Sequence, residues 1–89
     1  MEELRRLEKI LKALANKRRL VILRFLKKNK KASVGEIAEE IGISFKSTSK
    51  HLTVLSAVDV VEKEQKSLTM FYYISDNQHQ IVRLILSII

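Results

Sequence analysis

The sequence predicts a small, mainly α-helical domain with one β-hairpin. Apolar residues recur at helical spacing through most of the chain, and two short segments with helix-capping residues meet at Gly42. Strand-forming residues gather at one place only, between positions 60 and 74. The 89 residues include no Pro and two Gly, so we expect a single domain, residues 1–89, without a linker.

Two helices are predicted before position 30. Residues 2–15 place apolar side chains three or four positions apart with charged residues between them, which is typical of an amphipathic helix. Asn16 is a suitable cap for a second helix, whose apolar residues are too numerous for one exposed face. Those residues are Leu20, Ile22, Leu23, Phe25 and Leu26. We therefore expect the second helix to form the centre of the core.

Four lysines within residues 27–31 follow this second helix. Cations at a helix C-terminus offset its partial negative charge. Two interpretations stay open for this cluster: a solvated loop that carries helix-end charges, which we favour, and a direct contact with phosphate.

Residues 33–57 predict a helix-turn-helix. Ser33 and Glu36 have the spacing of a capping box at the start of a short helix. Gly42 supplies the left-handed residue that ends this helix, and Ser44 caps the next one. In such a motif the second helix is the one that reads DNA.

The helix after Ser44 has two unlike faces, separated at about 100° per residue. The apolar stripe consists of Thr48, Leu52 and Leu55, and the opposite basic face of Lys46, Lys50 and Thr53, flanked by Ser49 and Ala57. Phe45 lies nearer the apolar stripe, so we expect it to flank the core. Lysines and small hydroxyls fit a DNA major groove, and the alternative is a merely solvated amphipathic helix.

The pattern changes after this helix. Residues 60–74 predict a β-hairpin, in which Tyr72 and Tyr73 alternate faces so that at most one is in the core. Residues 76–89 then predict a last helix that is apolar on almost every side, with Asp76 as its expected N-cap. A helix this apolar does not stay exposed on a soluble monomer, so we expect it to pack against a partner.

From Leu14 to Ile74, roughly two thirds of the chain, the sequence resembles the ArsR family of small winged-helix repressors of bacteria and archaea. The matching residues are Leu14-Ala15-Asn16, Arg19, Ile22-Leu23, Glu36-Ile37-Ala38, Ile43-Ser44, Ser49-Lys50-His51-Leu52, Val54-Leu55 and Tyr72-Tyr73. The resemblance implies a winged helix-turn-helix of order ααααβ-hairpin-α, with residues 60–74 as the wing. It also implies a homodimeric DNA-binding regulator that dimerises through residues 2–15 and 76–89.

These observations give a set of expected contacts. The DNA contacts are Ser44, Lys46, Ser47, Ser49, Lys50, Thr53, Lys63 and Lys66, and the dimer contacts are Leu4, Leu7, Leu11, Ile81, Ile85 and Ile88. The wing ranks second to the helix because Glu62 and Glu64 dilute its positive charge. The net charge of +7 attracts anionic partners, and the motif makes double-stranded DNA, rather than a membrane, the expected one. We expect a repressor that binds an inverted repeat.

Three residues bear on the geometry of the reading helix and the hairpin: Asp59, Ser67 and His51. Asp59 stands where the family usually has the Gly that ends the reading helix, and the hairpin turn at Ser67 also lacks a Gly. Asp tolerates the left-handed conformation at a cost of about 1 kcal/mol, whereas the shape of the hairpin tip stays open. His51 is expected to be half-buried and to fix the reading helix, with a phosphate contact as the alternative.

Several function classes are disfavoured. The absence of Cys excludes disulfides and thiolate metal sites, and with the charged N-terminal segment it favours a cytoplasmic protein. Family members that sense metals use Cys, or Asp and His on the last helix; here only Asp76 and His79 are present, so we expect no metal and no cofactor. No residue pattern identifies a small-molecule effector. Ser47 and Ser49 beside His51 lie on one short helix without a cleft, so we expect no enzyme.

A second function class stays open. Many winged helices are protein-interaction modules, and a wing of mixed charge and a very apolar C-terminal segment are compatible with a non-DNA-binding adaptor. The basic face of the reading helix favours DNA.

Overall fold

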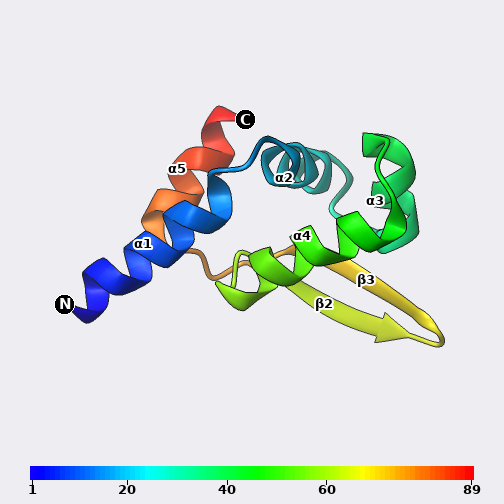
Figure 1. Ribbon diagram of the computed structural model, residues 1–89. Coiled ribbons are helices and arrows are strands. Elements are labelled where there is room, and N and C mark those ends of the chain that lie inside the picture. The colour runs from blue at the N-terminus through cyan, green and yellow to red at the C-terminus, as the bar shows by residue number, and fades with distance from the viewer.

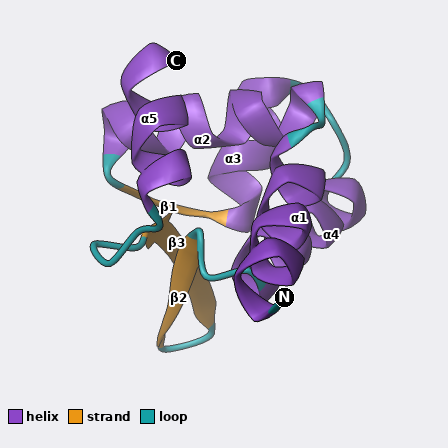
Figure 2. Cartoon of the chain, turned by 90° about the vertical axis from the view of Figure 1, so that its left-hand side faces the viewer, coloured by secondary structure: helices purple, strands orange, loops and turns teal.

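The computed structural model of the protein describes all residues 1–89 and consists of five helices and three strands (Figure 1). In chain order they are α1 (Glu2–Leu14), α2 (Lys17–Asn29), β1 (Lys31–Ser33), α3 (Val34–Ile41), α4 (Phe45–Ala57), β2 (Val61–Lys66), β3 (Thr69–Ile74) and α5 (Gln80–Ile88). The β2–β3 hairpin projects from the helices at one side of the molecule, as Figure 2 shows from a second direction. The predicted mainly helical, winged architecture is confirmed.

The helix α2 lies at the centre of the core. Asn16 caps it, because its Oδ1 accepts the backbone N–H of Arg19 at 3.1 Å. Ile22, Leu23 and Leu26 of α2 are all at most 1% exposed and belong to one cluster of 14 buried residues contributed by every layer of the fold. The prediction of a central second helix is therefore confirmed.

The helix-turn-helix forms as the capping residues predict. Ser33 accepts from the backbone N–H of Glu36 at 3.1 Å, and the Glu36 carboxylate accepts from the backbone N–H of Ser33 at 2.8 Å. Gly42 ends α3 with a φ of 73°, which residues with a Cβ adopt only with strain. Ser44 then caps α4 by accepting from the backbone N–H of Ser47 at 3.0 Å.

A third strand, β1, was not expected from the sequence. It pairs antiparallel with β3, so the sheet order is β1-β3-β2. Residues 31–33 are too few to show an alternating pattern, and it is the backbone pairing with residues 71–73 that makes them a strand. The paired Tyr72 is the buried tyrosine, at 6% exposed, whereas Tyr73 is half-buried.

The two turns that lack a Gly both use a left-handed residue. Asp59 has a φ of 60° and Ser67, at the tip of the hairpin, a φ of 56°. The expectation that Asp59 adopts this conformation is confirmed. The side chain beside Ser67, Leu68, is 98% exposed, so the tip ends in an apolar group.

The last helix begins later than predicted. Its cap is His79, whose Nδ1 accepts from the backbone N–H of Ile81 at 3.1 Å, so Asp76 as the N-cap was wrong. The residues before it are held in a non-helical path because Gln78 donates to the carbonyls of Val60 and Ser75 at 2.8 and 2.7 Å. The nine residues of α5 are few, and no helix of the protein has the length and hydropathy needed to span a bilayer.

The strained residue after α2 provides a test of this geometry. Lys30 has a φ of 65°, a region that costs a residue with a Cβ about 1–2 kcal/mol. Lys30→Gly should therefore raise the free energy of unfolding by about 1 kcal/mol, measured by urea titration at one fixed protein concentration. The control is Lys28→Gly, which removes the same charge inside the last turn of α2 and should lower stability. Destabilisation by both changes contradicts the assignment of strain to Lys30.

Candidate nucleic-acid interface

The helix α4 buries one face and presents the other to solvent. Thr48, Leu52 and Leu55 are each 0% exposed, as the apolar stripe predicts. Thr48 is satisfied in the core because its hydroxyl donates to the carbonyl of Ser44 at 2.9 Å. Lys46 and Lys50 are exposed on the opposite side. The core therefore fixes which way the basic face points.

The hydroxyl groups at and near the start of α4 are half-buried or already hydrogen-bonded, unlike its lysines. Ser47 and Ser49 are half-buried at the two borders of the basic face, and Ser44 already accepts the capping hydrogen bond. Thr53 is exposed, but its hydroxyl donates to the carbonyl of Ser49 at 2.9 Å. Thr53 therefore offers its remaining lone pair as an acceptor rather than a donor.

The expected DNA-contacting lysines are free of ion pairs. The three salt bridges of the protein are Arg5 with Glu2, Lys12 with Glu8, and Lys31 with Glu64. None involves Lys46 or Lys50 of α4, or Lys63 and Lys66 of the hairpin, and all four are exposed. With a net charge of +7, these groups present uncompensated positive charge to an anionic partner.

The Lys31–Glu64 pair changes the charge at the base of the hairpin. Lys31 Nζ lies 2.5 Å from Glu64 Oε1 and 5.5 Å from the ring centroid of Tyr73. The hydrogen bond from Lys31 and its charge lower the pKa of the Glu64 carboxyl below its ordinary value. Because Lys31 pairs with Glu64, Glu62 is the acidic residue of this hairpin that has no ion pair to offset its charge.

A set of hydrogen bonds from Arg19 fixes α4 against the first two helices. Its Nε donates to the carbonyl of Ala13 at 2.5 Å, its Nη2 to the carbonyl of Lys12 at 3.4 Å, and its Nη1 to His51 Nδ1 at 3.3 Å. An arginine only donates, so His51 accepts with an unprotonated Nδ1. Burial, followed by the charges of Arg19 and Arg18, lowers the pKa of His51. This supports the prediction that His51 fixes the reading helix.

Phe45 lies differently from the prediction. It was expected to flank the core, but it is 62% exposed at the first position of α4. Its angular position faces the apolar side, but its side chain does not pack against the buried core. A helical wheel gives the angular position of a side chain but not whether another element covers it at the end of the helix. The expectation that Phe45 flanks the core was therefore wrong.

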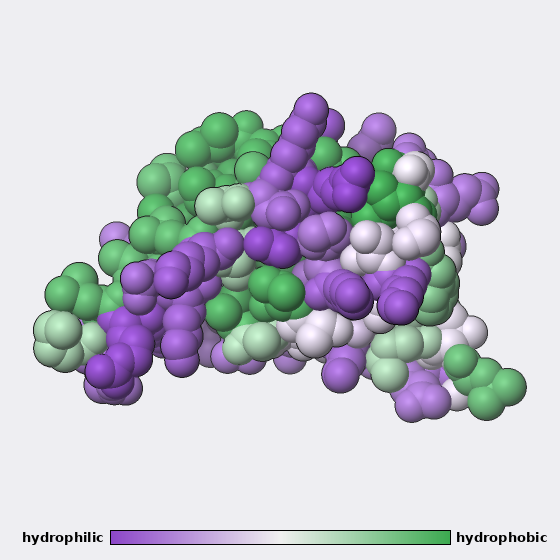
Figure 3. Space-filling model, in the orientation of Figure 1, coloured by the Kyte–Doolittle hydropathy of each residue, from purple (hydrophilic) through white to green (hydrophobic).

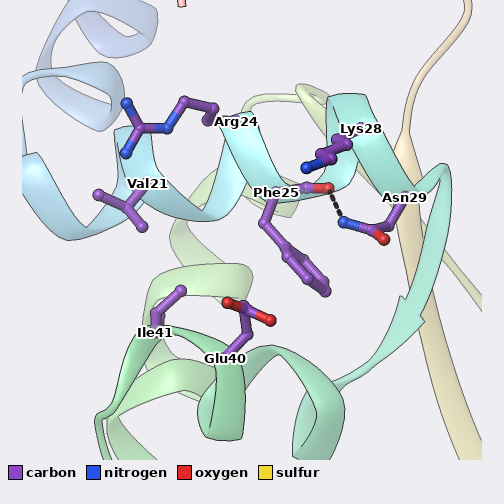
Figure 4. A pocket seen from close by; sticks show the side chains of 7 residues that line it. All are labelled: Val21, Arg24, Phe25, Lys28, Asn29, Glu40 and Ile41. Carbon is purple, nitrogen blue, oxygen red and sulfur yellow. Dashed lines mark hydrogen bonds between the residues drawn. The ribbon is translucent and has the colours of Figure 1, made fainter.

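A surface hollow of about 570 Å³ lies between α2 and α3 (Figure 4). Its lining residues are Val21, Arg24, Phe25, Lys28, Asn29, Glu40 and Ile41. Figure 4 shows the Phe25 ring extending toward Glu40 and Ile41, whereas Arg24 points away from them. Its charged groups do not converge on a common point, so the hollow does not form a binding site of defined charge.

Metal ligands are not grouped in the protein. No cluster of three or more His, Cys, Asp or Glu side chains is present. His79, one of the two residues considered from the sequence, uses Nδ1 to cap α5. Asp76 is exposed in the preceding loop.

Three of the six expected dimer contacts, Leu11, Ile85 and Ile88, line an apolar groove of about 360 Å³. Its lining residues, all hydrophobic, are Leu11, Leu14, Ala15, Leu20, Ile85, Ile88 and Ile89. Figure 2 shows α1 and α5 on either side of this region with α2 between them. Leu4, Leu11 and Ile88 are 61%, 44% and 69% exposed, whereas Leu7, Ile81 and Ile85 are half-buried. Leu84, 55% exposed, was missed because the sequence alone does not show which side of α5 faces α2.

Comparison with known proteins assigns the family. Residues 14–64 match the family model described as a helix-turn-helix domain, which covers more than half of the chain. The chain belongs to this helix-turn-helix family. The match begins at the end of α1 and extends through α4 into β2, so it includes the reading helix and the first strand of the wing.

Three relatives define the type more closely. The chain is 38% identical to the transcriptional activator HlyU of Vibrio cholerae over 69 residues, which are 78% of this chain and 63% of HlyU. It is 30% identical to the uncharacterized HTH-type transcriptional regulator MJ1325 of Methanocaldococcus jannaschii over 96% of this chain and 97% of that protein. A homodimeric winged helix-turn-helix domain of Mb0332 from Mycobacterium bovis, a possible ArsR-family regulator, superposes with a TM-score of 0.85 at 29% identity, covering 98% of this chain and 78% of that one.

The family and these relatives confirm the winged helix-turn-helix regulator of ArsR type that the sequence resemblance implies. The relatives are named as transcriptional regulators and not as enzymes, in agreement with the prediction. The chain spans about 63% of the length of HlyU and almost all of MJ1325.

The lowered pKa of His51 predicts a pH dependence of stability. The unfolded chain titrates this group near 6.5, and the folded protein below that value. The unfolded state therefore binds more protons in this window, and the stability that neutral His51 contributes is fully present above pH 6.5 and lost as the pH falls toward the folded pKa. Urea unfolding from about pH 7.5 downward should show wild type losing stability relative to His51→Gln. Parallel curves for the two proteins contradict this role.

Proposed function

We propose that the protein is a homodimeric transcriptional repressor that places the basic face of α4 in the major groove of an inverted repeat. The observation that carries this is the free positive charge of Lys46 and Lys50 on the outward side of a helix whose other side is fully buried. Ser47, Ser49 and Thr53 lie beside these lysines and would meet base edges or the sugar-phosphate backbone, while Ser44 lies at the helix end near the backbone.

The hairpin has a supporting role in this proposal. Lys63 and Lys66 lie on β2, on the arm that projects from the helices in Figure 2. An arm of this kind reaches the phosphates beside the groove that α4 occupies. Glu62 reduces the attraction, so we assign the hairpin a smaller share of the affinity than α4.

Dimerisation is proposed through α1 and α5. Hydrophobic residues gather over α5 on the upper left of Figure 3. The protein exposes 6167 Å², compared with about 5,400 Å² expected for a compact monomer of this chain length. An extended shape with an apolar groove favours association with a second copy, and Mb0332 is described as homodimeric. We therefore assign the interface to the predicted leucines of α1 and isoleucines of α5.

A twofold dimer determines the form of the DNA site. Two copies of α4 related by a twofold axis enter major grooves about one DNA turn, ~34 Å, apart. The site is then an inverted repeat, and occupying it excludes other proteins from the same DNA. HlyU is named an activator, so a reporter gene placed behind the bound site is needed to establish the sign of regulation. Binding to chromosomal DNA is consistent with the expected cytoplasmic location.

The proposal is tested by selecting duplexes from a random pool and sequencing the retained fraction. A homodimeric regulator should enrich an inverted repeat with half-sites about 10 base pairs apart, with an affinity that falls steeply as salt is added. Retention without any enriched sequence contradicts site-specific binding. Lack of retention at moderate salt contradicts DNA binding itself and supports the protein-interaction alternative.

The contribution of α4 can be measured on the selected duplex. Lys50→Ala should weaken binding and reduce the slope of log affinity against log salt by about one unit, because one phosphate contact is lost. Lys28→Ala is the matched control, since Lys28 is also exposed but lies in the last turn of α2, away from α4. A slope that Lys50→Ala leaves unchanged removes this residue from the interface.

The dimer interface can be tested separately. Ile88→Glu puts a charge on a side chain that is 69% exposed, so the isolated subunit should fold while the dimer is disrupted. Sedimentation at tens of micromolar should show a dimer for wild type and a monomer for Ile88→Glu. Leu68→Glu, at the 98% exposed tip of the hairpin, should remain dimeric. A monomeric wild type contradicts the proposed assembly.

A further inference from the structure

Phe45 is a large, exposed apolar side chain at the N-terminal end of α4. It occupies the first helical position and is 62% exposed. Ser49 and Thr53 follow it at four-residue steps, so the three side chains form one continuous row along the helix surface. This row borders Lys46 and Lys50. The Phe45 ring therefore lies at the N-terminal end of the surface proposed to meet DNA.

No feature of the folded chain uses this ring. It is not among the residues that pack against the buried core, and the apolar surface assigned to the dimer lies on α1 and α5. An aromatic ring left in water forgoes the hydrophobic stabilisation that its burial would give. Its place beside uncompensated lysines indicates an occupant that is anionic overall and apolar at one point.

We propose that Phe45 is a specificity-determining residue that packs against the 5-methyl group of a thymine in the major groove; this inference rests on the proposed function. The N-terminal residues of a recognition helix are those that reach base edges. The thymine methyl is the apolar group that bases present in this groove, and phenylalanine is one of the side chains that contact it. Helical side chains lean toward the N-terminus, which carries the ring past the first turn and toward the groove floor.

The contact adds sequence information that the lysines and Thr53 do not supply. Lys46 and Lys50 are mobile point charges, and the Thr53 hydroxyl has its proton engaged with Ser49. A ring packed on a methyl group discriminates thymine from cytosine without a hydrogen bond. The inference thus assigns at least one thymine of each half-site to Phe45.

The test uses the duplex selected by the wild-type protein, with each thymine of one half-site replaced in turn by deoxyuracil, which lacks only the methyl group. At one position wild type should bind about fourfold more weakly, the value expected from burying one methyl. Phe45→Ala should bind the unmodified duplex more weakly and should be indifferent to the same replacement. Its salt slope should equal that of wild type, because no charge changes.

Val54→Ala is the matched control. Val54 is also an apolar residue on α4, 38% exposed, but it follows Lys46 and Lys50 at four-residue steps and therefore lies on the other side of the basic face from Phe45. This variant should keep the wild-type sensitivity to deoxyuracil. Circular dichroism of both variants checks that α4 is intact.

The outcomes separate this inference from the proposed function. Wild-type binding to the unmodified duplex with no sensitivity to deoxyuracil at any position overturns the role of Phe45 and leaves the regulator intact. If wild type and Phe45→Ala are equally sensitive to deoxyuracil, the role of Phe45 is likewise overturned. Wild type that binds no duplex overturns both. Unchanged DNA binding by Phe45→Ala also overturns the proposed contact with thymine.

Discussion

The arrangement of the DNA-reading surface depends on Arg19. Arg19 lies in the first turn of α2, and its guanidinium donates hydrogen bonds to two carbonyls near the end of α1 and to His51 of α4. One side chain therefore connects three helices. The planar fork of an arginine suits this task because its donors leave in fixed directions. Through His51, the orientation of the reading helix is tied to α1, which is also the helix proposed to meet the second subunit. In the proposed dimer, the contacts of Arg19 would therefore help to set the distance between the two reading helices.

This link also explains why α4 can carry its lysines without cost to the fold. Thr48, Leu52 and Leu55 anchor the helix from below, and Arg19 holds its flank. No carboxylate is needed beside Lys46 or Lys50, and none of the ion pairs reaches them. The acidic groups that do pair with lysines lie on α1 and the hairpin base. The positive charge of the reading face is thus left available for phosphate.

Local signals predicted the elements well, because caps and periodicity act within a few residues. The capping box at Ser33, the left-handed Gly42 and the burial of Thr48 follow from the sequence alone. The misses each depend on tertiary contacts. Strand β1 exists because β3 lies beside it, and the start of α5 is delayed because Gln78 bonds to the carbonyl of Val60. Phe45 is exposed because its side chain does not pack against the buried core. Contacts with DNA and with a second subunit remain predictions.

The side chains on the exposed face of α4 are suited to binding DNA in general more than to choosing a sequence. Lysines supply affinity for any duplex, and the hydroxyls of Ser44 and Thr53 are already engaged within the helix. A single subunit is therefore left with the hydroxyls of Ser47 and Ser49 and the apolar contact proposed for Phe45 as means of choosing a sequence. Two subunits held at a fixed spacing choose by geometry, since only DNA with correctly placed half-sites satisfies both at once. In the proposed dimer, the apolar surface of α1 and α5 would therefore contribute to specificity, because it would set the spacing of the two copies of α4.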